Sequence, residues 1–474
     1  MRRRLAAFVA ALAGAFALAA GAQAATFTVS DLTIPGGGGT PLAATLYEPT
    51  GAPPAGGFPA VVMFHGLGAT RASLDPLARS FFADQGYVVL AFDARGHGGS
   101  GGLWDLDGPN ANADARAVYD FLAARPEVAA TKIGAYGLSL GGGAVWSSAV
   151  IGKVPWAAIA PEASWVDLYS ALFPQSLPKS GVLAQLASLV PAGRTDPEIL
   201  SHEQQAINGA DLASLRSITS PRSVAGRLGG FTTPTLILQG RRDFLFDVDQ
   251  ARRAFAELAG PKRLYLGDFG HAPSDFGTAP DLVHMSLELR TWFDRFLKDE
   301  PNGIDTLPRV EIAKSPFTGS AQFAAFPSPS KLVLRATGGG RWLTAAGRVQ
   351  RIFALPRRKL ETIGTPVVSV TVSGTKPFQH LVAVLSATSG GSETIVSEGG
   401  IPLRPRAKPR RVSIRLLDQV VTIPAGSRLR LTLAATSTAQ NPANALYLLG
   451  VRDGSRVHLA RISVTLPVLK QAIS

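Results

Sequence analysis

The segment that decides the fold is Lys132-Ile133-Gly134-Ala135-Tyr136-Gly137-Leu138-Ser139-Leu140-Gly141-Gly142-Gly143-Ala144-Val145-Trp146. It begins as a β-rich run and can continue as a helix after Gly141, so it predicts a strand, a tight turn and a helix. Within it, Gly137 to Gly141 matches Gly-x-Ser-x-Gly, a pattern that presents a serine on a strained turn. The pattern alone is weak in a chain with 50 glycines, and Gly98 to Gly102 matches it too.

The surroundings of the two serines separate them. Ser139 follows a strand and precedes a helix, whereas Ser100 follows its strand by a loop and is followed by more loop. Ser139 is therefore the predicted nucleophile, and the alternative is a glycine-rich turn of purely structural use. The segment from Gly96 to Gly101 also fits Gly-x-Gly-x-x-Gly, but no helix opens there, which excludes dinucleotide binding.

A serine hydroxyl needs a base to take its proton, and that base needs a carboxylate to fix its tautomer. After a turn of this kind, the expected chain order is serine, acid, histidine. Asp243 follows the strand at 235–238 and is the predicted acid, and His271 lies in a loop beyond the strand at 262–266 and is the predicted base. The other candidate acids are Asp247, which is predicted in a loop, and Asp249, which is predicted as a helix N-cap. The other candidate histidines are His202 in the predicted cap, His284 in a predicted helix, and His380 and His458 in the predicted β domain.

Two backbone donors are predicted for the oxyanion that develops in acyl transfer. One is the N–H group of Leu140, directly after the serine, and the other is that of Leu67, in the glycine-rich loop after the strand at 61–64. His65 in this loop is predicted to brace it. Asp93 and Arg95 in the next loop fit an internal ion pair or a solvated turn equally well.

From residue 58 to about 296, short β-rich runs alternate with helical patterns, which predicts an α/β domain with a mainly parallel sheet over 25–300. Amphipathic pieces separated by prolines interrupt the alternation and predict a helical cap at about 164–233. After Pro301, short Val, Ile, Leu and Thr runs recur between Gly, Pro and Ser clusters, which predicts an all-β sandwich or jelly roll over 301–474.

The first 24 residues predict a signal peptide. Three arginines precede an uncharged Ala- and Leu-rich run, and the run ends in the small-x-small pattern Ala22-Gln23-Ala24. We therefore expect a secreted or otherwise extracytoplasmic protein, with an uncleaved membrane anchor as the alternative. Removal of the signal peptide lowers the formal net charge from +13 to +10.

The chain contains no cysteine, which excludes disulfides, thiolate nucleophiles and cysteine-based metal sites.

The ordered motifs around His65, Asp93, Ser139, Asp243 and His271 resemble those of the α/β-hydrolase superfamily. The helical cap and the β domain, with runs at 363–370 and 381–385, resemble the Xaa-Pro dipeptidyl-peptidase and cocaine-esterase family. This resemblance implies a hydrolase domain, a cap and a jelly roll packed beside the active site. The chain departs from cocaine-esterase-like members at Phe64-His65-Gly66, where they supply a tyrosine donor to the oxyanion.

Three hypotheses remain open from the sequence. The first is a serine hydrolase that cleaves small ester, amide or peptide substrates, with general carboxylesterases included. The second is a proline-directed dipeptidyl peptidase, for which Glu162 is a candidate to bind the substrate amine, although a structural role at a strand end also fits. The third is a non-catalytic envelope-binding protein that uses the basic cluster at 404–411, which also fits a solvated loop. No cofactor, metal, nucleic acid or stable membrane insertion is expected, and the oligomeric state stays open.

Overall fold

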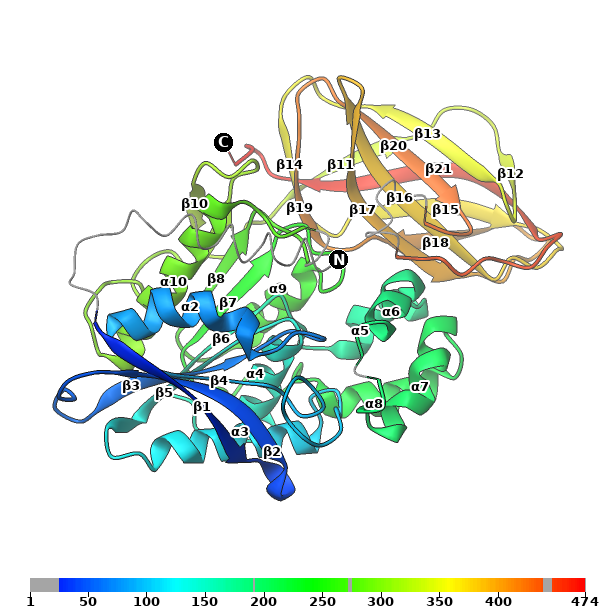
Figure 1. Ribbon diagram of the computed structural model, residues 1–474. Coiled ribbons are helices and arrows are strands. Elements are labelled where there is room, and N and C mark those ends of the chain that lie inside the picture. Colours follow the sequence, from blue (N-terminus) through cyan, green and yellow to red (C-terminus); the bar gives the residue numbers. More distant parts are fainter. Residues whose placement is uncertain (1–24, 191, 272–274, 438–445, 474) are drawn as a thin grey trace.

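A ten-stranded sheet forms the centre of the larger domain in the computed structural model, which describes residues 25–190, 192–271, 275–437 and 446–473 (Figure 1). The strand order is β1-β2-β4-β3-β5-β6-β7-β8-β9-β10. The pairs from β4 to β9 are parallel, and β1, β2 and β10 add antiparallel edges. The strands are β1 (Phe27–Pro35), β2 (Pro41–Pro49), β3 (Phe58–Phe64), β4 (Val88–Phe92), β5 (Val128–Leu138), β6 (Ala158–Glu162), β7 (Thr235–Gly240), β8 (Lys262–Gly267), β9 (Val310–Ala313) and β10 (Ser320–Phe323).

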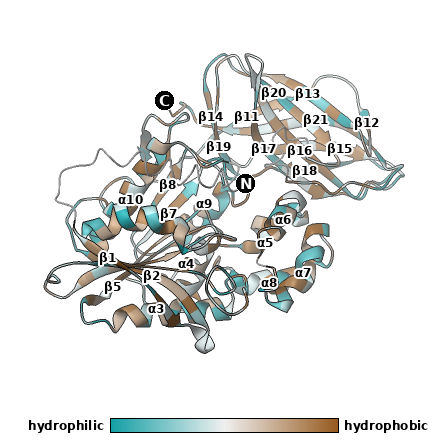
Figure 2. Ribbon diagram, viewed as in Figure 1, coloured by the Kyte–Doolittle hydropathy of each residue, from teal (hydrophilic) through white to brown (hydrophobic). Residues whose placement is uncertain are grey.

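Helices cover both faces of this sheet because its strands are apolar on both sides. The helices α3 (Pro109–Ala123), α4 (Leu140–Val150) and α9 (Val248–Glu257) share one core with the sheet. The short α2 (Asp75–Leu77) region and α10 (Ala279–Leu297) share the other. Brown and teal residues alternate along α10 in Figure 2, as expected for a helix with one buried face. Ser139 and its turn therefore stand at the carboxyl end of a strand held rigidly from both sides.

Four helices lie between β6 and β7, in the interval where the sequence predicts a cap. They are α5 (Leu168–Leu172), α6 (Ser180–Ala187), α7 (Pro197–Asn208) and α8 (Leu212–Thr219). Their apolar side chains share a core with residues of the larger domain and with Val382, Val384 and Leu417 of the C-terminal domain. The helices thus contact both domains. Within the described residues, no helix has both the length and the apolar composition needed to cross a membrane.

The C-terminal domain is built from two antiparallel sheets around one apolar core (Figure 1). The seven-stranded sheet has the order β18-β15-β21-β14-β19, with β11 and β12 also paired to β21, and the four-stranded sheet has the order β13-β20-β16-β17. The strands are β11 (Ser330–Arg335), β12 (Arg341–Thr344), β13 (Arg348–Ala354), β14 (Leu360–Gly364), β15 (Val367–Ser373), β16 (His380–Ser389), β17 (Ser392–Pro402), β18 (Arg410–Arg415), β19 (Gln419–Ile423), β20 (Arg428–Ala434) and β21 (Arg456–Val468). We call residues 330–473 the β domain.

The strands β9 and β10 differ from the sequence prediction, which assigns residues after 300 to the β domain. Both strands belong to the ten-stranded sheet, where β9 pairs in parallel with β8. A four-residue apolar run carries no information about which sheet it will join, so this sheet continues past residue 300. The predicted signal peptide at 1–24 lies outside the described residues.

Candidate active site

Ser139 stands on a strained turn between β5 and α4. Its backbone dihedrals are φ 57° and ψ −113°, and a non-glycine residue in this region costs about 1–3 kcal/mol. The turn closes because its flanking glycines lack side chains. A Cβ atom on Gly137 would clash with the carbonyl oxygen of Gly141, and one on Gly141 would clash with that of Phe64. The sequence pattern around Ser139 is thus required by close backbone packing.

A chain of hydrogen bonds links the three residues that the sequence selects. Ser139 Oγ lies 3.0 Å from His271 Nε2, and His271 Nδ1 lies 2.8 Å from Asp243 Oδ2. The three side chains come from the ends of β5, β7 and β8, which are neighbours or near neighbours at one edge of the parallel sheet. The structure therefore brings Ser139, Asp243 and His271 together in the order that proton transfer requires.

Asp243 is fully buried and is surrounded by donors. Its Oδ1 atom accepts hydrogen bonds from the N–H groups of Leu245 (2.8 Å) and Phe246 (2.9 Å), and its Oδ2 atom accepts one from Gln239 (3.0 Å). These donors stabilise the ionised carboxylate and fix its orientation toward His271. The competing acids are engaged elsewhere, since Asp247 accepts the N–H of Asp418 and Asp249 pairs with Arg252.

The β domain contacts the loop that carries Asp243. Gln419 Nε2 donates to the carbonyl oxygen of Asp243 (2.7 Å), and the N–H group of Val420 donates to that of Arg241 (2.9 Å). From the cap, the buried Lys179 ammonium donates to the carbonyl oxygens of Phe244 (2.8 Å) and Leu245 (2.7 Å). Three parts of the molecule thus hold one loop. The sequence gives no signal for Gln419 or Lys179, because their role depends on contacts between distant segments.

The predicted oxyanion donors lie beside Ser139. Leu140 is the first residue of α4, and the first N–H groups of a helix have no partner within it. The loop that bears Leu67 passes close to the serine, since a Cβ atom on Gly66 would come within 3.7 Å of Ser139 Cβ. Leu67 and Leu140 both line the cavity at Ser139. The positions are compatible with the two predicted donors.

His65 braces two loops. Its Nδ1 atom donates to the carbonyl oxygen of Gly66 (2.8 Å), its Nε2 atom accepts the N–H of Ala94 (2.9 Å), and burial lowers its pKa to about 4. The neutral ring therefore joins the loop that bears Leu67 to the loop that bears Ala94.

The predicted ion pair between Asp93 and Arg95 is wrong. Asp93 pairs with Arg71 (2.5 Å), and Arg95 pairs with Asp114 (2.7 Å). Opposite charges two residues apart along a turn point away from each other here.

An apolar cavity of about 140 Å³ opens at Ser139 between the larger domain and the cap. Of its 24 described lining residues, 19 are apolar, among them Trp104, Leu140 and Phe246 from the larger domain and Trp165, Leu172 and Leu215 from the cap interval. Ser139 lies in this lining with Thr195, His202, Glu203 and Thr219. A bound molecule would therefore place its reacting group at Ser139 and its apolar part against the cap.

Glu162 lies beneath the turn and outside this cavity lining. Its carboxylate accepts a hydrogen bond from Tyr136 (2.6 Å), and its backbone carbonyl accepts the N–H of Ser139 (2.9 Å). Burial raises its pKa to about 7. The structure does not place Glu162 where a substrate amine would lie, so its observed role is to support the turn.

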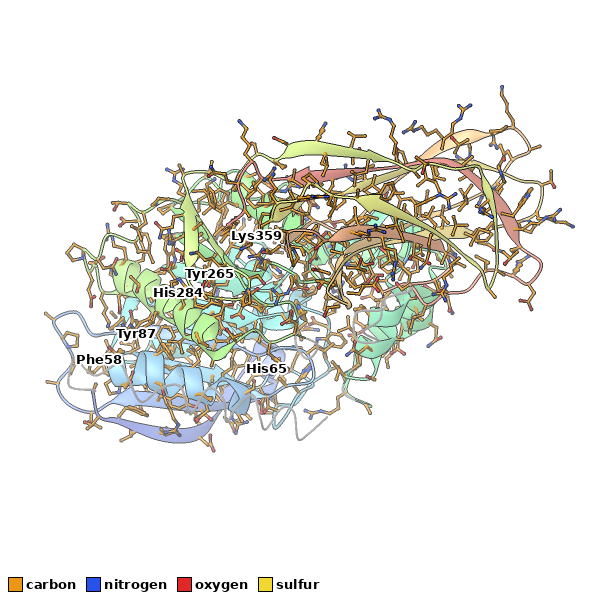
Figure 3. The ribbon with its side chains drawn as sticks, turned by 90° about the horizontal axis from the view of Figure 1, so that it is seen from above. Phe58, His65, Tyr87, Tyr265, His284 and Lys359 are labelled. Carbon is orange, nitrogen blue, oxygen red and sulfur yellow. The ribbon has the colours of Figure 1, made fainter. Side chains whose placement is uncertain are left out.

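One group of possible metal ligands occurs within the described residues. His284, Glu288 and Glu311 bring their ligand atoms within 4.8 Å of one another. Arg263 already pairs with both carboxylates, at 2.8 Å from Glu288, and His284 lies 2.7 Å from Glu311. Figure 3 shows His284 beside Tyr265 and well separated from His65. Because the guanidinium supplies the positive charge that these carboxylates need, the group does not fit a metal site.

Comparisons with known proteins agree on the fold. The family described as X-Pro dipeptidyl-peptidase (S15 family) matches residues 38–273. A CocE/NonD family hydrolase from Staphylococcus aureus has a TM-score of 0.74 at 15% identity, with 94% of each chain covered. An aminopeptidase from a marine sediment Thaumarchaeota archaeon has a TM-score of 0.71 at 15% identity, covering 94% of this chain and 97% of that one. No curated protein matches the sequence significantly.

A third solved structure, of an α-amino acid ester hydrolase, has a TM-score of 0.71 at 14% identity and covers 95% of this chain and 98% of its own. At these identities the solved structures establish the fold. They confirm the predicted combination of an α/β domain with a mainly parallel sheet and a C-terminal all-β domain.

Proposed function

Because this chain is a serine hydrolase of the α/β-hydrolase superfamily that resembles the Xaa-Pro dipeptidyl-peptidase and cocaine-esterase family, we propose that it cleaves ester or amide bonds through an acyl-enzyme on Ser139. One observation carries the proposal. The hydrogen bonds from Ser139 to His271 and from His271 to Asp243 form an unbroken chain, and Ser139 lies in the lining of an apolar cavity.

In the proposed first half-reaction, Ser139 Oγ attacks the substrate carbonyl carbon while its proton passes to His271 Nε2. Asp243 accepts the Nδ1–H of His271 and stabilises the imidazolium. The N–H groups of Leu140 and Leu67 donate to the oxyanion. His271 then gives its proton to the leaving oxygen or nitrogen, and the acyl group stays on Ser139. In the second half-reaction, His271 takes a proton from water, the hydroxide oxygen attacks the acyl carbon, and the acid leaves as Ser139 regains its proton.

The cavity favours an apolar acyl group. A cavity of about 150 Å³ lined by Leu, Ile and Phe holds one benzene molecule, so the 140 Å³ at Ser139 suits a phenyl ring or a short alkyl chain. We therefore propose butyrate-, hexanoate- or benzoate-sized esters as the preferred substrates, with a general carboxylesterase as the best description.

A dipeptidyl-peptidase activity is the second candidate, because the matched family is named for it. A peptide with a free amino terminus needs a carboxylate partner in the binding site, and among the described residues of the cavity lining Glu203 on α7 is the one carboxylate. Turnover of Gly-Pro-p-nitroanilide that Glu203→Gln abolishes would support this alternative. Turnover of p-nitrophenyl butyrate with no release from the peptide substrate would exclude it.

The deciding experiment for the proposed mechanism is fluorophosphonate labelling of the full chain, followed by peptide mapping of the modified residue. We expect the label on Ser139 and, in parallel, hydrolysis of p-nitrophenyl acetate, butyrate and hexanoate. Ser139→Ala should show neither. Labelling at a different serine, or equal turnover by Ser139→Ala, would refute the proposal.

We also propose that the protein is exported and that its signal peptide is removed. The proposal rests on the three arginines, the apolar run and the Ala22-Gln23-Ala24 pattern at the amino terminus. Mass spectrometry of protein recovered outside the cytoplasm should find Ala25 as the first residue. A chain retained in the cytoplasm with its leader intact would contradict export.

A further inference from the structure

The charge of this protein is divided very unevenly between its two domains. Residues 25–329 hold 23 Lys and Arg against 29 Asp and Glu, a formal net charge of −6. Residues 330–474 hold 21 Lys and Arg against five Asp and Glu, a formal net charge of +16. Strong charge asymmetry between the halves of a chain indicates interaction with a polyanion. The modest net charge of the whole protein conceals this division.

Nearly all of the positive charge in the β domain faces solvent. Every one of its lysines and arginines is exposed except Arg351 and Arg430, which are half-buried. Of its five carboxylates, Glu361, Glu398 and Asp418 are buried and Glu393 is held by Arg430. Within the described residues, no other lysine or arginine of the domain has a carboxylate within 4.0 Å. The surface therefore carries a positive charge that the domain does not neutralise.

Part of this charge lies on the outer face of the seven-stranded sheet. Residues directly opposite one another in neighbouring strands point to the same side, and one such row joins Ser413, Ser369, Ser463 and Arg335. Arg411 lies on the same side and reaches across β15 to donate to Ser463 Oγ (3.3 Å). The outer face thus combines arginines with small hydroxyl side chains, a flat and polar surface rich in hydrogen-bond donors.

Strand β12, which pairs with the start of β21, lies at the end of the β domain that is farthest from the larger domain (Figure 1). Trp342 on β12 is 55% exposed, and its ring lies 5.3 Å from His458 and 5.0 Å from the Arg456 guanidinium. The loop between β17 and β18 adjoins the same end, since the N–H of Gly374 donates to the carbonyl of Arg406 (2.9 Å). Nitrogen-tipped side chains project from this part of the β domain in Figure 3.

We propose that this end of the β domain, which we call the distal basic surface, binds an anionic polysaccharide. It comprises Trp342, Arg404, Arg406, Lys408, Arg411 and Arg456. Guanidinium groups bind the carboxylates or phosphates of such a polymer in a bidentate manner, serine and threonine hydroxyls accept its hydroxyl hydrogens, and the exposed indole stacks on a sugar ring. The acidic larger domain would be held away from the polymer, with its active site free for substrate.

The side chains on this surface favour a polysaccharide over a membrane or a nucleic acid. An element that lies in a membrane interface buries a continuous apolar face, whereas the ring of Trp342 lies beside His458 and Arg456. Single-stranded nucleic acid needs several aromatic side chains along its path, and the surface has one tryptophan. The test below therefore also measures binding to anionic vesicles and to DNA.

The test measures binding of full-length protein to immobilised polygalacturonate, a carboxylated polysaccharide, with neutral dextran as the control. We expect binding that weakens at least tenfold, roughly, when the salt concentration rises from about 50 mM to about 200 mM, as for other polyelectrolytes. The variant Arg406→Gln/Lys408→Gln/Arg411→Gln should lower the affinity about tenfold or more, and Trp342→Ala about fivefold.

The matched control is Arg357→Gln/Arg358→Gln/Lys359→Gln, which removes the same charge from an exposed loop of the same domain. Figure 3 places Lys359 at the end nearest the larger domain, and this variant should change the affinity less than about twofold. Unchanged hydrolysis of p-nitrophenyl butyrate by both variants verifies that they fold. Equal losses in the two variants, or binding only to phosphatidylglycerol vesicles or to DNA, would overturn the proposal.

Discussion

Two segments of this chain carry the same Gly-x-Ser-x-Gly pattern, and the structure uses them in opposite ways. Ser139 directly follows strand β5, adopts a positive φ, and its Oγ atom lies 3.0 Å from Nε2 of His271. Ser100 is fully buried, where its hydroxyl donates to the carbonyl of Asp93 (2.5 Å) and accepts the N–H of Ala43 (2.9 Å). One serine is presented to a cavity, and the other ties a loop to a strand.

The comparison shows that one short pattern can adopt two different backbone conformations and make two different sets of contacts. Around Ser139, the glycines let a strand and a helix approach closely enough to form the strained turn. Around Ser100, the chain forms a loop that Arg71 and Asp93 hold together through an ion pair. The predictions below test this contrast, in order of decreasing effect.

Replacing each serine by alanine gives the largest expected contrast. Ser139→Ala removes the proposed nucleophile, so kcat/KM for p-nitrophenyl butyrate should fall by about 10⁴- to 10⁶-fold with the unfolding free energy nearly unchanged. Ser100→Ala should keep kcat/KM within about twofold and lower the unfolding free energy by about 1–3 kcal/mol, because two buried hydrogen bonds are lost. Esterase assays and urea denaturation measure both. Loss of activity in a folded Ser100→Ala protein would reverse the assignment.

Substitution of the acids near the two serines should also affect activity in one case and stability in the other. Asp243→Asn no longer holds the required tautomer of His271, so kcat should fall by about 10⁴-fold. Asp93→Asn weakens the pair with Arg71 and should cost about 1–3 kcal/mol of stability, with kcat changed less than about tenfold. Steady-state kinetics and thermal unfolding of both variants check this. A mild kinetic effect of Asp243→Asn would point to another acid.

A pH dependence should mark the turn at Ser139, because Glu162 lies beneath it. Burial raises the pKa of Glu162 from its ordinary value of 4.5 to about 7 in the folded protein. As the pH rises, the unfolded chain therefore loses this proton before the folded protein does. Between about pH 4.5 and pH 7 the contribution of Glu162 to stability should therefore fall, by about 3 kcal/mol in total.

Glu162→Gln can still accept the hydrogen bond from Tyr136 but does not titrate. Urea denaturation from pH 4.5 to pH 7.5 should show a shallower loss of stability for this variant than for the wild type. Other buried carboxyls titrate in both proteins, so the difference between the two curves isolates Glu162. Parallel curves would mean that Glu162 is ionised in the folded protein.

The smallest expected effect comes from narrowing the cavity, which Ser139 lines and Ser100 does not. Ala206 on α7 lines the cavity at Ser139, and Ala206→Trp should fill part of it. We expect kcat/KM for p-nitrophenyl hexanoate to fall about tenfold while that for the acetate changes less than about twofold. Ala184→Trp, at an exposed position of α6, is the matched control and should leave both values unchanged. An equal loss for acetate and hexanoate would mean that the acyl chain binds elsewhere.

The sequence predicts the parts of the site that depend on local structure. Ser139, Asp243 and His271 each follow a strand whose β-rich run is readable by itself, so their convergence follows once the strands are parallel. The sequence prediction places β9 and β10 in the wrong sheet, because a short apolar run does not reveal which strand it will pair with. Gln419 and Lys179 were missed for a related reason, since each acts through contacts with a loop far away in the chain.

The contact between Gln419 and Asp243 also sets an order of events during synthesis. Gln419 follows Asp243 by 176 residues, so a nascent chain that ends after α10 already contains Ser139, Asp243 and His271 but lacks this contact. The loop of the acid is then held from one side only. The loop that carries Asp243 therefore gains its support from the β domain only after β19 has been synthesised and has docked against it.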